Sequence, residues 1–108
     1  QRMQSYAEAN DVQVEIVPTW NSPAVHFDPR CIDSVKASAE DFGYTMREIV
    51  SGAGHDAVYV SRVVPTAMIF VPCLHGISHN EAESATPEDV TAGSNVLLHA
   101  VLKADKIF

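Results

Sequence analysis

Two short segments of the chain combine glycine, histidine and carboxylate, the residue types from which hydrolytic sites are built. Residues 51–56 read Ser-Gly-Ala-Gly-His-Asp, and residues 72–83 contain Cys73, His75 and His79 together with acidic side chains. Imidazole and thiolate groups bind zinc, and a carboxylate can accept a proton from an attacking water. These two segments are therefore the candidate parts of a functional site.

The second segment offers Cys73, His75 and His79 as equal candidates for a metal ligand on spacing alone. A Cys-x-His-x3-His string fits a soft zinc site, although three ligands from one short loop are unusual without further cysteines. A single histidine from this loop, joined by ligands elsewhere, is the better hypothesis. The competing interpretation is a solvated or backbone-bonded loop histidine.

The first segment places two glycines directly before a predicted helix. It fits a tight turn with Asp56 as a charge partner of the helix N-terminus. Equally, its small residues can let the backbone approach a ligand, with N–H groups aimed at an anionic or carbonyl oxygen. It lacks the Gly-Lys-Ser/Thr ending of a phosphate loop. No serine in the chain lies in a Gly-x-Ser-x-Gly elbow, so no nucleophilic triad is predicted.

The elements that would position these segments alternate along the chain. Helix caps and apolar periodicity predict helices over 1–10, 28–43, 55–64 and 86–104, and strands over 12–17, 44–50 and 66–71. From residue 28 the order is helix, strand, helix, strand, helix, which predicts an α/β fold with a mainly parallel sheet flanked by helices. Both candidate segments follow strands, so they should open at the same edge of the sheet.

Composition limits the classes of partner. Seven basic residues against 14 acidic ones leave a formal net charge of −7 and no cluster to neutralise a phosphate backbone, so no nucleic acid is expected. No apolar run reaches the roughly 20 residues that span a bilayer, so no membrane partner is expected either. Cys31 and Cys73 are expected to be free thiols in a reducing compartment, the cytoplasm. The first residue, Gln1, suggests that the chain was cut from a longer one.

Three motifs carry a resemblance to a known family. Residues 51–57 (SGAGHDA), 68–72 (MIFVP) and 76–80 (GISHN), followed by Glu83, resemble the end of the N-carbamoyl-L-amino acid hydrolases. That group includes allantoate and ureidoglycolate amidohydrolases and β-ureidopropionases. It is part of the zinc peptidase superfamily of carboxypeptidase G and aminoacylase. The similarity extends over essentially the whole chain.

The resemblance implies a division of the chain and a set of site residues. Residues 1–22 would end a lid and dimerisation domain, and residues 23–108 would be the C-terminal part of the catalytic domain. Composition alone also indicates a break at Trp20–Pro23. By match to the family motifs, His79 is the metal ligand, His55 and Asp56 are catalytic, and Gly54, Ser78 and Asn80 are substrate-binding. Cys73 and His75 match no ligand position.

The implied function is hydrolysis of linear C–N bonds in N-carbamoyl amino acids or allantoate-like ureido compounds by a metal-activated water. Zinc is the expected metal, with Mn, Co or Ni as alternatives, and the whole enzyme is expected to be a homodimer acting on a small-molecule substrate. The alternatives are an aminoacylase or dipeptidase of the same superfamily, and a non-catalytic α/β association module. The isolated chain is expected to be inactive, because catalytic zinc needs about three protein ligands.

Overall fold

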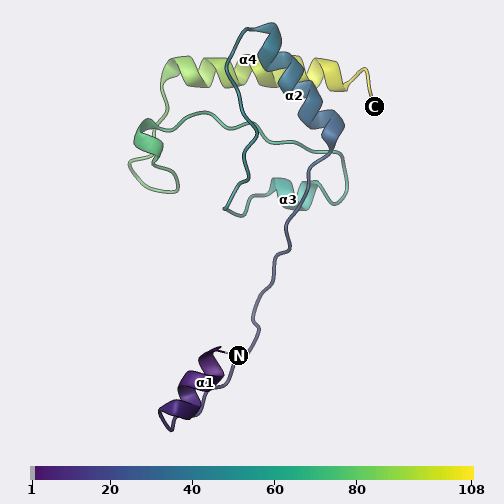
Figure 1. Ribbon diagram of the computed structural model, residues 1–108. Helices are drawn as coiled ribbons and strands as arrows, with labels where there is room; N and C mark the ends of the chain where they lie inside the picture. The colour runs from purple at the N-terminus through teal and green to yellow at the C-terminus, as the bar shows by residue number, and fades with distance from the viewer. Residues whose placement is uncertain (1) are drawn as a thin grey trace.

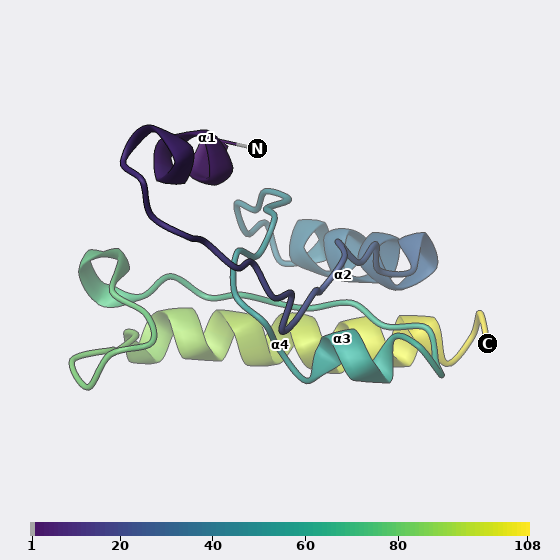
Figure 2. The same cartoon turned by 90° about the horizontal axis from the view of Figure 1, so that it is seen from below.

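The computed structural model describes residues 2–108, in which helices are joined by long non-helical segments. In chain order the helices are α1 (Arg2–Ala9), α2 (Pro29–Asp41), α3 (Ala57–Val60), the 3-10 turn η1 (Leu74–Gly76) and α4 (Pro87–Ala104) (Figure 1). Helix α2 lies beside α4 in both Figure 1 and Figure 2. Among the described residues, these are the two helices that pack against each other.

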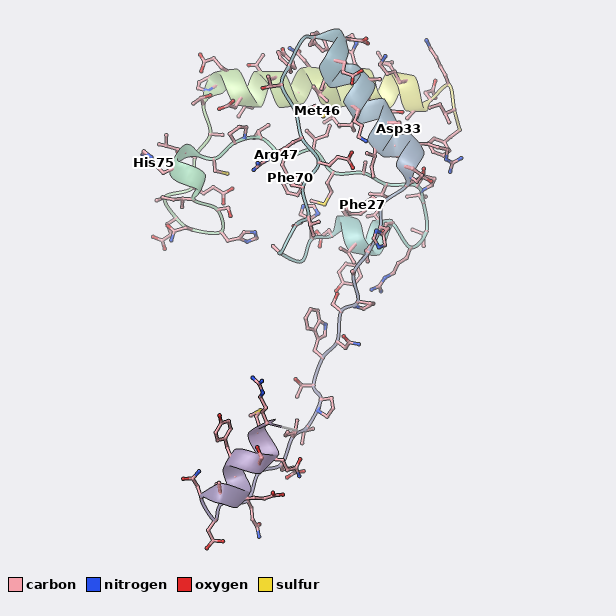
Figure 3. The ribbon with its side chains drawn as sticks, viewed as in Figure 1. Phe27, Asp33, Met46, Arg47, Phe70 and His75 are labelled. Atoms are coloured by element: carbon pink, nitrogen blue, oxygen red, sulfur yellow. The ribbon has the colours of Figure 1, made fainter. Side chains whose placement is uncertain are left out.

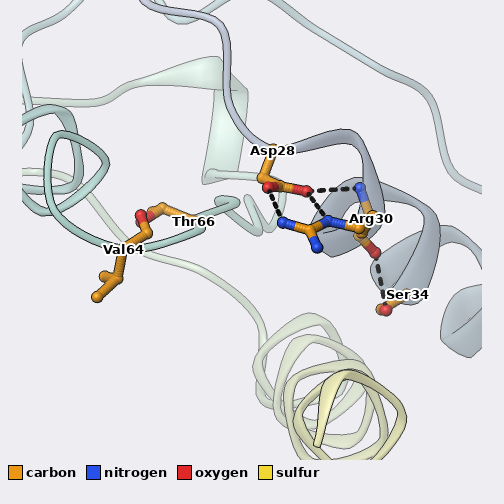
Figure 4. Close-up of polar contacts among 5 residues, drawn as sticks. All are labelled: Asp28, Arg30, Ser34, Val64 and Thr66. Atoms are coloured by element: carbon orange, nitrogen blue, oxygen red, sulfur yellow. Dashed lines mark hydrogen bonds and ion pairs between the residues drawn. The ribbon is translucent and has the colours of Figure 1, made fainter. Parts of the chain in front are cut away.

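The two long helices begin where the sequence predicts, because each has a side-chain cap followed by proline. Asp28 accepts a hydrogen bond from the Arg30 backbone N–H at 2.9 Å, and its carboxylate also binds the Arg30 guanidinium (Figure 4). Thr86 Oγ1 accepts from the Asp89 N–H at 3.1 Å. In both helices the cap satisfies an N–H group that has no partner within the helix.

Small side chains allow α2 and α4 to pack closely. Ser34, Ser38 and Ala39 of α2 are buried, as are Val96 and Ala100 of α4. The Ser38 hydroxyl, which has no exposed surface, donates to the Ser34 carbonyl at 2.7 Å and so leaves no unsatisfied polar group in the interface. Near the C-terminal ends of the two helices, Lys103 Nζ lies 2.8 Å from the Asp41 carboxylate. The rings of Phe42 and His99 pack edge to face, with their centroids 4.7 Å apart.

The predicted sheet is not confirmed, because residues 2–108 contain no strand. Segments 12–17, 44–50 and 66–71, which the pattern assigns to strands, are non-helical but form no ladder with one another. A strand exists only when its N–H and C=O groups pair with a neighbouring strand, and the described part of the chain supplies no such neighbour. The helix predicted over 55–64 is also too long, since only Ala57–Val60 is helical. β-branched valines and Pro65 disfavour its continuation.

Segments 44–50 and 66–71 nevertheless lie against the helix pair. They line a cavity of 780 Å³ together with residues of α2 and α4. Gly93 of α4 lies so close to the end of segment 66–71 that a Cβ atom added to it would be 2.5 Å from Val71 Cγ1. The Asn95 amide donates to the Tyr44 hydroxyl at 3.2 Å. Figure 3 shows Met46 and Phe70, one from each segment, on the same side of α4.

Helix α1 lies apart from the rest of the structure, at the end of a long non-helical segment (Figures 1 and 2). The radius of gyration of 20.0 Å exceeds the roughly 13 Å of a compact chain of this length. The predicted break at residues 20–23 falls within this segment, where Trp20 is 79% exposed. The assignment of residues 1–22 to a separate domain remains a prediction.

Candidate functional site

Residues 73–84 form a loop that is closed at its base and held by its own hydrogen bonds. The Leu74 N–H donates to the Ser84 carbonyl at 2.7 Å, and the Gly76 N–H donates to the Cys73 carbonyl at 2.9 Å. Near the tip, the Glu83 N–H donates to the Asn80 carbonyl at 2.9 Å. The loop is therefore an ordered structure, although most of its side chains are exposed.

His79 lies at the tip of this loop with its backbone in the left-handed region, at φ 55°. His75 has the same feature at φ 57°, and Figure 3 shows it at the edge of the structure, away from Phe27 and Phe70. Such a conformation costs a non-glycine residue on the order of 1–3 kcal/mol and persists only where neighbouring interactions hold it. For His79 one such interaction is a hydrogen bond from its backbone N–H to Glu83 Oε2 at 2.7 Å.

Cys73 is in a poor state to act as a thiolate ligand. Burial raises the pKa of the Cys73 thiol, and the nearby Glu83 carboxylate raises it further. The Cys73 Sγ lies 3.7 Å from Glu83 Oε1, a weak hydrogen bond in which the protonated thiol is the donor. Zinc binds the thiolate, so a metal at Cys73 would have to displace this proton. This agrees with the absence of Cys73 from the ligand positions that the family resemblance implies.

The turn over residues 51–56 positions His55 by a hydrogen bond to α3. His55 Nδ1 accepts from the Ala57 N–H at 3.0 Å, so the neutral ring carries its proton on Nε2. Asp56, which the turn interpretation assigns to the helix start, forms no side-chain cap bond. The Asp56 carboxylate therefore does not cap α3 and remains available to contact another group.

The two glycines of this turn are not required by the described structure. A Cβ atom added to Gly52 or Gly54 would meet nothing within 4 Å, and neither residue has a positive φ. A tight turn or close packing would have required one or the other. The tight turn and the approach of the backbone to a ligand both remain predictions.

The two other residues assigned to substrate have different surroundings. Asn80 Oδ1 accepts from the Ala82 N–H at 2.9 Å, which fixes the start of the turn after His79. Ser78 is exposed and forms none of the hydrogen bonds described for residues 2–108. The Ser78 hydroxyl is thus the freer of the two groups to meet a ligand.

The described residues do not form a complete metal site. Within residues 2–108, no three His, Cys, Asp or Glu side chains come together in a way that could hold a metal ion. Figure 1 shows the 51–56 turn and the η1 loop on the same side of α4, but no hydrogen bond joins them. A divalent metal at His79, the ligand that the family resemblance implies, would need its other ligands from outside residues 2–108.

Glu83 is the residue whose role the sequence analysis missed. Glu83 follows the third motif, and its residue type and position in the sequence predict no function for it. Its carboxylate connects the base of the loop to its tip, through Cys73 Sγ and the His79 N–H. The i to i+4 spacing of His79 and Glu83 was the available signal, but in an irregular loop that spacing does not predict contact as it does in a helix.

Comparison with known proteins decides the family. The sequence profile of peptidase family M20/M25/M40 matches residues 5–103. The chain belongs to this family. Among M20 relatives, it is 49% identical to an N-carbamoyl-L-amino-acid amidohydrolase of Rhizobium meliloti, over 77% of this chain and 20% of that protein. It is 33% identical to a ureidoglycolate hydrolase of Oryza sativa subsp. japonica, over 75% of this chain and 17% of that protein.

Solved structures agree with this membership. A hydantoinase/carbamoylase family amidase from Burkholderia ambifaria matches with a TM-score of 0.80 and 52% identity, covering 94% of this chain and 24% of that one. An amidase of the hydantoinase/carbamoylase family from Burkholderia multivorans has 64% identity and a TM-score of 0.70, over 72% and 19% of the two chains. The resemblance found in the sequence is confirmed. The chain spans about a fifth of the length of the curated M20 relatives it matches.

Proposed function

We propose that this chain is the C-terminal part of the catalytic domain of a metal-dependent amidohydrolase that cleaves linear C–N bonds in N-carbamoyl amino acids or ureido compounds. The observation that carries the proposal is the match to peptidase family M20/M25/M40 over residues 5–103, a stretch in which the 73–84 loop presents His79 at its tip. Relatives named N-carbamoyl-L-amino-acid amidohydrolase and ureidoglycolate hydrolase support this substrate class.

In this proposal each site residue has a distinct task. The His79 imidazole is one ligand of a divalent metal, expected to be zinc, with Mn, Co or Ni as alternatives. When bound, such a metal lowers the pKa of a water and polarises a carbonyl group. His55, whose neutral ring carries its proton on Nε2, can donate a hydrogen bond to a substrate oxygen, and the Asp56 carboxylate can accept a hydrogen bond from a substrate N–H group. Gly54, Ser78 and Asn80 would contact the substrate.

The remaining ligands and the general base are assigned to other parts of the whole protein. Exposed apolar side chains indicate that the rest of the domain packs against this chain. Segments 44–50 and 66–71 would then become strands beside strands that the rest of the domain contributes. Val50 is 96% exposed and Phe70 is 50% exposed. Residues 1–22 would then end the lid and dimerisation domain, and the whole enzyme would be a homodimer.

The proposed compartment is the cytoplasm. Cys31 and Cys73 are both free, as is typical of proteins in a reducing environment. Among residues 2–108, no helix is long and apolar enough to cross a membrane.

The test compares two histidines of the same loop in the complete protein that contains this chain. His79→Asn removes the proposed ligand, and His75→Asn is the matched control. Asparagine tolerates the left-handed backbone at both positions. Zinc affinity, measured by competition with a chelator, should fall in His79→Asn by more than the roughly 10–100-fold typical of outer-sphere changes. It should be unchanged in His75→Asn.

Turnover of the wild-type protein then separates the functional classes. N-carbamoyl amino acids and ureidoglycolate should be hydrolysed, whereas preferential turnover of N-acetyl amino acids or dipeptides would identify an aminoacylase or dipeptidase instead. Equal zinc affinity in His79→Asn and the wild type would refute the ligand assignment. No metal-dependent turnover of any of these substrates would leave only the association module.

A further inference from the structure

We propose that Glu83 is the positioning residue for His79: its carboxylate holds the backbone that presents the proposed metal ligand. This inference rests on the proposed function. It adds a residue that acts through another residue and does not itself contact the substrate. The carboxylate is placed for this task because it reaches both the base and the tip of the 73–84 loop.

The contact at the tip acts on the backbone of His79. Glu83 Oε2 accepts the His79 N–H at 2.7 Å, a short distance for an N–H donor. This bond is made next to a φ of 55°, a left-handed value that is uncommon for residues other than glycine. The direction of the His79 Cα–Cβ bond, and hence of the imidazole, follows from that backbone conformation.

The contact at the base ties the same carboxylate to the segment that packs on α4. Glu83 Oε1 accepts from the Cys73 thiol at 3.7 Å, and Cys73 follows Val71 and Pro72. Val71 is the residue that lies against Gly93 of α4. One side chain therefore connects the tip of the loop, through Cys73, to the segment that packs on α4.

Loss of the acceptor should loosen His79 without removing the ligand. Without Glu83, no other described hydrogen bond holds the His79 N–H, and the strained backbone can relax toward an ordinary conformation. The imidazole would then spend less time in the direction that metal binding needs. Mutation of a residue that orients a metal ligand without binding the metal typically lowers metal affinity by roughly 10–100-fold.

The experiment uses four variants of the complete protein and zinc as the probe. Glu83→Ala removes the acceptor, Glu83→Gln keeps an acceptor oxygen but removes the charge, and Glu81→Ala removes a charge from the same loop without touching the bond. His79→Asn reports the ligand itself. Zinc affinity is measured by chelator competition, and the visible spectrum of the cobalt-loaded protein reports ligand geometry.

We expect Glu83→Ala to weaken zinc binding by about 10-fold or more and to broaden or shift the cobalt spectrum. Glu83→Gln should recover most of the affinity, and Glu81→Ala should match the wild type. If Glu83→Ala does not fold, Glu83→Met, which keeps the length of the side chain without a strong acceptor, makes the same comparison against Glu83→Gln.

The outcomes separate this inference from the proposed function. A large loss in His79→Asn with wild-type affinity in Glu83→Ala overturns the positioning role alone. A Glu83→Gln variant as defective as Glu83→Ala also overturns it, because charge and not hydrogen-bond acceptance would then be decisive. Unchanged affinity in His79→Asn overturns the ligand assignment and the positioning role with it.

Discussion

The close approach of α4 to the segment that leads into the site makes Gly93 a sensitive position. A Cβ atom at residue 93 would lie 2.5 Å from Val71 Cγ1, whereas carbon atoms in contact are normally about 3.5–4.0 Å apart. Gly93→Ala therefore forces a movement of at least about 1 Å. Valine is stiff at χ1, so the movement falls on the backbone of the segment or of α4.

The expected free-energy change is the difference of two opposing effects. Overpacking costs about 1–3 kcal/mol. Replacing glycine by alanine inside a helix stabilises it by up to about 1 kcal/mol. We therefore expect Gly93→Ala to destabilise the complete protein by about 1–2 kcal/mol, combining these two principles. Helix propensity taken alone predicts the opposite sign.

The assay is a double-mutant cycle followed by thermal unfolding. About 1 kcal/mol corresponds to a shift in Tm of roughly 2–4 °C for a domain of 150–250 residues. Gly93→Ala should lower Tm in the wild-type background, and the penalty should largely disappear in a Val71→Ala background, where Cγ1 is absent. Ser94→Ala, at an exposed position of the same helix, controls for helix propensity. A higher Tm in Gly93→Ala, or an equal penalty in both backgrounds, would refute the reasoning.

Three further predictions follow from the caps and from the incomplete site. Thr86→Ala should cost about 0.5–2 kcal/mol of stability in a denaturant titration, because the Asp89 N–H loses its acceptor; a change within error would show that the cap is dispensable. The pKa of Asp28 is lowered mainly by the hydrogen bond to Arg30, so the contribution of its charge to stability is present above the ordinary pKa of about 3.9 and is lost as pH falls through the lower folded value. The stability difference between the wild type and Asp28→Asn should accordingly shrink below about pH 4, and a difference constant with pH would contradict this. The isolated 108-residue chain should not hydrolyse N-carbamoyl amino acids with added zinc, since the proposed site has one ligand in this chain where about three are needed; measurable metal-dependent turnover would disprove it.

Features that depend on neighbours along the chain could be predicted from the sequence. The starts of α2 and α4 follow from Asp28-Pro29 and Thr86-Pro87, because a cap acts over two or three residues. The family could be recognised for a similar reason, since each of its motifs is a contiguous run of residues. The choice of His79 among three candidates came from that recognition and not from spacing, and its role as a ligand remains a prediction.

Other features were decided by tertiary structure. The apolar pattern of 44–50 and 66–71 favours strands, but a strand needs a partner, and residues 2–108 provide none. The closeness of Gly93 to Val71, and the hydrogen bond that joins Glu83 to the backbone of His79, depend on where the chain turns in space. By itself the sequence determined the helix starts and the family, because these are encoded locally. Only the tertiary structure decided which carboxylate holds His79, because that requires the positions of atoms that no local pattern specifies.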